Sequence, residues 1–185
     1  PHTVTISQSA VLSGNMSLTN TSFVAYGGVT TTGINTITVN NATSTSPLGW
    51  TGGITGGTGT ISFTNVVPIN ISAGMTTTGA FNITNTASIN GAAASSNYIT
   101  GSGLLKFASG TWTDVRVDAP NASMQVSGAF TVSQAAGAYV PSTSYGFNLG
   151  PYGPSNITFG GAFSITSPIT LKISGPLSND IIFSS

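Results

Sequence analysis

Apolar and polar residues alternate over short stretches of this chain, a pattern typical of β-strands that bury one face. The N-terminal stretch shows it most clearly, because Val4, Ile6, Ala10 and Leu12 share one face and Gln8 is the polar exception. Further candidate strands, bounded by Gly, Pro, Asn and Ser, span residues 16–26, 33–39, 59–67, 77–89, 97–107, 111–117, 122–133, 156–166, 169–174 and 180–183. The pattern predicts an all-β protein, and short strands at this spacing favour an antiparallel β-sandwich or barrel.

One six-residue pattern occurs three times, with a glycine, an alanine and a phenylalanine at its start. The copies span residues 79–84, 128–133 and 161–166, so they lie about 49 and 33 residues apart. One interpretation is the repeating unit of a β-solenoid. The unequal spacing favours the other interpretation, in which three strands of similar composition each follow a glycine turn or bulge.

Charge is the most unusual feature of the composition. Only 3% of the 185 residues are charged, the formal net charge is zero, and cysteine is absent, although 39% of residues are hydrophobic. Three cations cannot line a nucleic-acid groove, and without thiols the chain has neither disulfides nor the usual zinc ligands. The length suits one domain, and no run of about 18 apolar residues predicts a membrane span.

Candidate catalytic groups are correspondingly few. Asp114 and Asp118 lie four residues apart beside Arg116, which an exposed strand with paired charges explains more simply than a pair of catalytic carboxylates. The single histidine, His2, lies in an expected tail, a poor place to orient a catalytic base. We therefore expect neither an enzyme nor a metal site, and no cofactor.

Asparagines in the acceptor pattern for N-glycosylation are frequent. Composition alone would generate many of them, but a surface so poor in charge needs another solvating group. The chain is therefore expected to carry N-linked glycans, and the candidate sites are Asn15, Asn20, Asn41, Asn70, Asn82, Asn121 and Asn156.

The N-terminal alternating stretch has two interpretations. It is either the first strand of its own sandwich or a tail, residues 1–14, that leaves the domain formed by residues 15–185 and completes the sheet of a neighbour. Strand addition of this kind obtains affinity from backbone hydrogen bonds and specificity from alternate side chains. Because the tail and its groove differ, such a contact propagates into an open filament.

Taken together, the free-looking N-terminal strand, the Thr/Ser/Asn/Gly-rich β pattern, the glycosylation acceptors and the near absence of charge point to one family. The chain resembles subunits of the archaeal thread, a glycosylated surface filament of thermoacidophilic archaea. The resemblance implies an immunoglobulin-like, pilin-like antiparallel β-sandwich joined head to tail by donor-strand complementation. The donor residues would then be Val4, Ile6, Gln8, Ala10 and Leu12.

The resemblance thus favours a homopolymer of identical subunits, an extracellular cell-surface filament with a role in adhesion or cell–cell contact. A secreted carbohydrate-binding or adhesin module is the first alternative, with Trp50, Trp112, Tyr145 and Tyr152 as stacking residues. A viral or S-layer shell protein is the second.

The scarcity of carboxylates yields a prediction about acid. Acid unfolds proteins largely because native carboxylates of lowered pKa must take up protons, and this chain has three Asp and no Glu. We expect the melting temperature to stay nearly constant from about pH 7 to about pH 2. Circular-dichroism melting curves over that range check this, and a large drop would contradict it.

Overall fold

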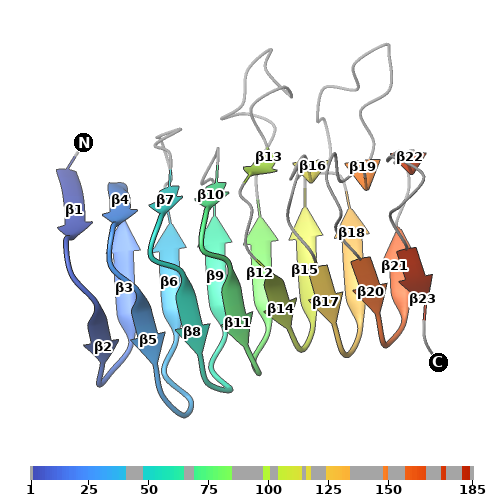
Figure 1. Ribbon diagram of the computed structural model, residues 1–185, viewed down its shortest axis with the longest axis horizontal. Coiled ribbons are helices and arrows are strands. Elements are labelled where there is room, and N and C mark those ends of the chain that lie inside the picture. The colour runs from blue at the N-terminus through green and yellow to red at the C-terminus, as the bar shows by residue number, and fades with distance from the viewer. Residues whose placement is uncertain are drawn as a thin grey trace.

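Short parallel strands stack along one axis of this protein, with the N-terminus at one end and the C-terminus at the other (Figure 1). The computed structural model describes residues 2–40, 48–64, 69–84, 98–100, 104–113, 116–117, 124–133, 148–149, 157–165, 172–173 and 181–183. In these ranges the chain winds repeatedly through three sheets, and as far as β18 each circuit adds one strand to each sheet. The protein is a parallel β-solenoid, and each circuit is called a coil below.

From β1 to β18 the strands of the three sheets follow each other in rotation along the chain. Sheet A contains β1 (His2–Ile6), β4 (Thr21–Ala25), β7 (Leu48–Trp50), β10 (Ile69–Ile71), β13 (Tyr98–Thr100) and β16 (Arg116–Val117). Sheet B contains β2 (Ala10–Leu12), β5 (Val29–Thr31), β8 (Ile54–Gly56), β11 (Met75–Thr77), β14 (Leu105–Phe107), β17 (Met124–Val126), β20 (Ile157–Phe159) and β23 (Ile181–Phe183). Sheet C contains β3 (Met16–Thr19), β6 (Ile37–Asn40), β9 (Ile61–Thr64), β12 (Phe81–Thr84), β15 (Gly110–Thr113), β18 (Phe130–Ser133) and β21 (Phe163–Ile165). A fourth, two-stranded sheet pairs β19 (Asn148–Leu149) with β22 (Lys172–Ile173).

The all-β prediction is confirmed, but the antiparallel sandwich of immunoglobulin-like or pilin-like kind is wrong. Neighbouring strands in all three sheets run parallel and pair between successive coils, as β1 does with β4 and β4 with β7. Alternation of polar and apolar residues reports only that one face of a strand is buried. It is the same for an antiparallel sandwich and for a solenoid with one face inside, so it could not distinguish them.

The predicted donor strand is wrong as well, because the N-terminal segment pairs with its own chain. Residues 2–6 form β1 against β4, and residues 10–12 form β2 against β5. Gln8, the exception in the apolar face, lies exposed at the corner between these two strands. The alternation continues across a bend between two sheets, which a pattern read as one straight strand does not reveal.

Corners between sheets are made by residues with special backbone requirements. Asn20 takes a φ of 50° and separates β3 from β4, which divides the strand predicted over residues 16–26. Asparagine tolerates this left-handed conformation better than most residues. At the next corner of the stack, a Cβ on Gly52 would collide with the carbonyl group of Gly27 one coil earlier. Coils therefore approach each other most closely where glycine forms the corner.

Inward side chains of the three sheets form one continuous core. It changes along the axis from mainly aliphatic in the early coils to aromatic from β9 onward. Neighbouring rings there have centroids 4.4 to 5.8 Å apart, in stacked and edge-to-face arrangements, and they belong to Phe63, Phe81, Phe107, Trp112, Phe130, Phe159 and Phe163. Such contacts stabilise by roughly 0.5–1.5 kcal/mol per pair beyond the burial of apolar area.

The six-residue pattern marks one strand of the repeating coil of the solenoid, contrary to the interpretation favoured from its spacing. Its three phenylalanines, Phe81, Phe130 and Phe163, begin β12, β18 and β21 of the same sheet. Phe130 lies directly opposite Phe163, whereas β15 separates Phe81 from Phe130. The first interval therefore covers two coils and the second covers one, so the coils differ in length and no constant period appears in the sequence.

The intervening strand, β15, carries glycine where its neighbours carry phenylalanine. Gly110 lies opposite Phe130, and Trp112, two residues later, is fully buried and fills the core beside both Phe81 and Phe130. Hydrogen bonds from side chains also replace part of the backbone hydrogen-bond ladder between β12 and β15. Trp112 Nε1 donates to the Phe81 carbonyl oxygen at 3.1 Å, and the Thr111 N–H donates to Asn82 Oδ1 at 3.0 Å.

This arrangement makes Gly110 intolerant of a side chain. A Cβ there would meet the Phe81 carbonyl oxygen at less than contact distance, with Phe107 Cε2 at 3.2 Å on another side. We expect Gly110→Ala to lower the free energy of unfolding by about 2 kcal/mol or more, measured by denaturant unfolding. Gly14→Ala is the matched control, because nothing lies within 4 Å of its Cβ position. It should change stability by less than about 1 kcal/mol, and equal effects of the two variants would contradict this account of β15.

Candidate functional site

The first coil, β1 to β3, presents the free edges of all three sheets. Each of these strands is the terminal strand of its sheet, so one side of it pairs with no strand in the described part of the chain. The other side is well bonded: the Ala10 N–H donates to the Gly28 carbonyl oxygen at 2.8 Å, and Met16 N–H donates to the Thr36 carbonyl oxygen at 2.9 Å. Since alternate residues of a parallel strand bond to opposite sides, Val11 and Ser17 direct their backbone groups off the free edge.

Inward side chains of the first coil are incompletely covered. Their partners one coil later are essentially inaccessible, as Phe23, Val29 and Ile37 show. In the first coil the corresponding residues are half-buried, apart from Val4, which is 37% exposed. This apolar end surface consists of Val4, Ile6, Ala10, Leu12, Met16 and Leu18. Covering each of the larger side chains would contribute about 1 kcal/mol, half the value for complete burial.

Large apolar side chains are also exposed around this end. The four that the described residues expose are Val4, Val11 (72% exposed), Tyr26 (62%) and Ile34 (82%). All four belong to the first two coils. Scattered apolar residues are ordinary on a protein surface, but among the described side chains these four lie at one end, next to the incompletely covered first coil.

The first coil lacks the usual devices that keep sheet edges apart. Natural free edges carry proline, or lysine and other charged residues, and these oppose pairing with another chain. Residues 2–19 contain no Lys, Arg, Asp, Glu or Pro. The first coil therefore offers both apolar surface and available backbone groups to another parallel strand, with no charge to be desolvated.

The strands at the opposite end of the solenoid also carry large apolar residues. Sheets B and C end in β23 and β21. Phe163 of β21 is only partly buried, and the register places Ile181 and Phe183 of β23 opposite Ile157 and Phe159. The two ends are thus different surfaces, and sheet A ends at β16, earlier in the chain than sheets B and C.

The glycosylation candidates are spread over the chain. Asn15 and Asn20 are exposed in the first coil, and Asn15 Oδ1 accepts a hydrogen bond from the Thr36 N–H at 2.9 Å. Asn82 is half-buried and holds Thr111 as described above. Asn70 lies in β10, whose side chains are outside the description, and Asn41, Asn121 and Asn156 lie outside the described residues. Glycosylation stays a prediction.

The other candidate residues considered from the sequence are only partly described. His2 begins β1 and is exposed, Arg116 begins β16, and Asp114 and Asp118 lie outside the described residues. Trp112 is fully buried, so it is not available to stack on a sugar. The side chain of Trp50 is not described, and Tyr145 and Tyr152 lie outside the described ranges. No helix within those ranges is long and apolar enough to cross a membrane.

Comparisons with family models, with curated proteins and with solved structures find nothing that matches this chain.

Because the first coil is partly exposed, truncating a side chain there to alanine should lower the free energy of unfolding less than the same truncation in the interior. Leu18 and Ile83 occupy the same inward position in β3 and β12, but Leu18 is half-buried and Ile83 is fully buried. We expect Ile83→Ala to cost about 2–5 kcal/mol of unfolding free energy, and Leu18→Ala about 1 kcal/mol. Denaturant unfolding of dilute protein, where the first coil is uncovered, measures both. Equal costs would show that the end coil is as well covered as the interior.

Proposed function

We propose that this protein is a structural subunit of an extracellular filament, in which the first coil of one copy stacks on the last coil of the next. The observation that carries the proposal is the first coil, with its three free sheet edges and its half-buried apolar side chains. The partner is a second copy of this chain. The role at a cell surface, in adhesion or cell–cell contact, belongs to the same proposal.

Stacking continues the interaction that joins coils within the chain. A strand of a second copy that paired with β2 would reach the backbone groups of Val11, and its inward side chains would cover Ala10 and Leu12. Because the two ends of the solenoid are different surfaces, the contact is head to tail and does not close on itself. Repetition of that contact gives a linear filament whose axis is the solenoid axis.

The composition supports this setting. With 3% charged residues, the chain has little electrostatic repulsion to oppose association of copies. N-linked glycans at exposed asparagines, of which Asn15 and Asn20 are described, would solvate the sides of a filament. Glycans at these two positions would also lie next to the stacking surface, so their presence would limit how coils approach.

A charge placed on the free edge tests the proposal. Val11→Lys puts an ammonium group on an exposed residue of β2, where lysine opposes strand pairing without disturbing the core. Thr55→Lys is the matched control, because Thr55 lies on the same outward ladder, two coils into the solenoid, and is also exposed. We expect Val11→Lys to raise the concentration required for assembly by about tenfold or more, and Thr55→Lys to leave it near the unmodified value.

Sedimentation velocity and electron microscopy of the three proteins supply the measurement. We expect the unmodified chain and Thr55→Lys to form filaments and Val11→Lys to form none. The melting temperatures of the three proteins should agree. An unmodified chain that stays monomeric at high concentration would overturn the proposal, as would equal assembly of the two lysine variants. Closed particles or planar arrays would favour the shell-protein alternative.

A further inference from the structure

A hollow of about 470 Å³ lies on the outside of sheet B, where the strands turn toward sheet C. Its volume falls in the range of small-molecule sites, roughly 300–1,000 Å³. The residues that line it come from four successive coils, from Thr77 at the end of β11 to Thr158 and Gly160 at the end of β20. At about 4.8 Å per strand, the hollow extends roughly 14 Å along the solenoid axis.

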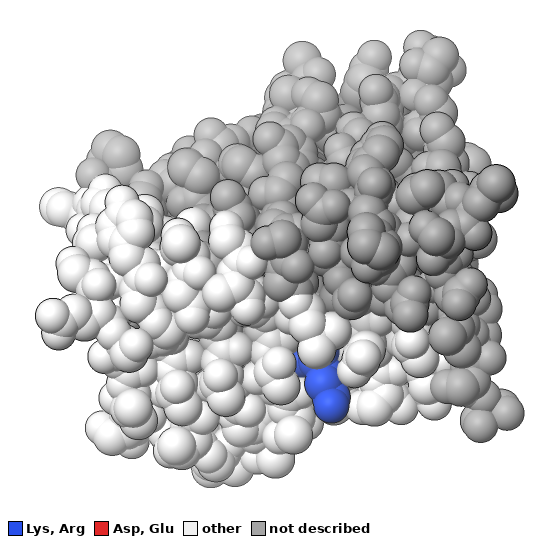
Figure 2. Space-filling model, in the orientation of Figure 1, with Lys and Arg blue, Asp and Glu red and all other residues white. Residues whose placement is uncertain are grey.

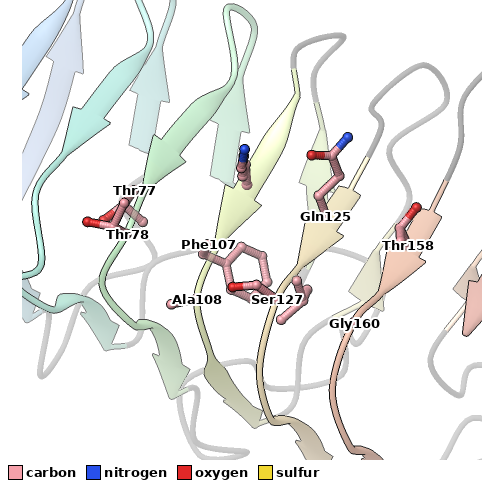
Figure 3. A pocket seen from close by; sticks show the side chains of 10 residues that line it. Thr77, Thr78, Phe107, Ala108, Gln125, Ser127, Thr158 and Gly160 are labelled. Atoms are coloured by element: carbon pink, nitrogen blue, oxygen red, sulfur yellow. The ribbon is translucent and has the colours of Figure 1, made fainter. Parts of the chain in front are cut away.

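Two rows of residues form this hollow. The outward residues of β14, β17 and β20 are in register as a row of Lys106, Gln125 and Thr158. The next corner holds only small residues, Ala108, Ser127 and Gly160. Gln125 and Thr158 project from adjacent strands to the same side, beside Ser127 (Figure 3). Long polar side chains next to a row of small ones leave a trough parallel to the axis.

The trough contains one positive charge, that of Lys106. Figure 2 shows one blue patch on the described part of this face. Lys106 is exposed and lines the hollow. Glutamine, serine and threonine around it both donate and accept hydrogen bonds, whereas the ammonium group only donates. The matching ligand therefore has an anionic group together with several hydroxyl groups.

From these features we infer that the trough binds an acidic saccharide, a chain of hydroxylated rings carrying carboxylates, laid along the solenoid axis. A carboxylate of one ring pairs with Lys106, and hydroxyls of the chain bond to Gln125, Ser127 and Thr158. Polyphosphate and DNA offer no row of hydroxyl groups to these side chains, so the uncharged polar residues beside Lys106 favour the saccharide. The inference goes beyond the proposed assembly and does not depend on it, because the trough lies on the side of the solenoid and the stacking surface at its end.

Isothermal titration calorimetry with a short oligogalacturonate tests the site. Methyl-esterified oligogalacturonate is the control ligand, since it keeps the sugar rings and loses the charge. Poly-glutamate keeps carboxylates and lacks the hydroxyl groups. We expect saturable binding of the free acid alone. Equal binding of the ester or of poly-glutamate, or no saturable binding of the free acid, would overturn the inference.

Two variants show whether the trough itself is responsible. Lys106→Gln should weaken binding about tenfold or more, as expected for loss of a charge-assisted hydrogen bond. The double variant Lys106→Gln with Thr55→Lys restores the net charge and moves the cation two coils along the same outward ladder. It should bind as weakly as Lys106→Gln alone. Recovery of affinity in the double variant would show that only general electrostatic attraction operates, and unchanged binding by Lys106→Gln would exclude this site. Both altered residues are exposed, so melting curves should show all variants folded.

Discussion

Every coil of this protein is held by the coil beside it, through strands that pair in parallel and inward side chains that stack at the same position in successive coils. Phe130, for example, contacts Phe163 of the next coil of its sheet, and Ile83 lies opposite Trp112 of the coil that follows it. In such a structure stability is approximately a sum of coils and of the contacts between neighbours. A local irregularity must therefore be compensated within one coil. Between β12 and β15 this occurs: where Gly110 removes an aromatic side chain, Trp112 fills the space and its indole N–H bonds the Phe81 carbonyl oxygen.

The same dependence explains why the end coil differs from the interior. An interior coil is covered on two sides, whereas in the described part of the chain β1 to β3 have a neighbouring coil on one side, β4 to β6. Here Val4 and Val11 are exposed, and no charged residue protects the edge. The apolar N-terminal segment, which as a sequence resembles a tail inserted into a neighbour, thus forms an end surface with the composition of the interior.

How far the sequence predicts this fold depends on which physical signal is used. The all-β class follows from alternation, but Val4 and Ile6 belong to one sheet and Ala10 and Leu12 to another, and one straight strand over these residues is wrong. Direction of pairing was not predictable from alternation, because it depends on which strands meet. The phenylalanine pattern contained that information, but the long coil between Phe130 and Phe163 and the glycine at position 110 concealed the period. The row of Lys106, Gln125 and Thr158 was missed for the same reason: its members become neighbours only when the register of three coils is known.

Scarcity of charge acquires a positional meaning from the structure. In a solenoid, outward residues of successive coils form ladders with roughly 4.8 Å between neighbours, so like charges repeated on a ladder would repel along its whole length. The ladder from Val11 through Thr30, Thr55 and Thr76 avoids this with small uncharged residues, and Lys106 interrupts it once. Uncharged ladders let coils, and copies, stack without an electrostatic cost. They also leave the field of a single lysine unopposed by its described neighbours, which is the condition under which one cation can select an anionic ligand.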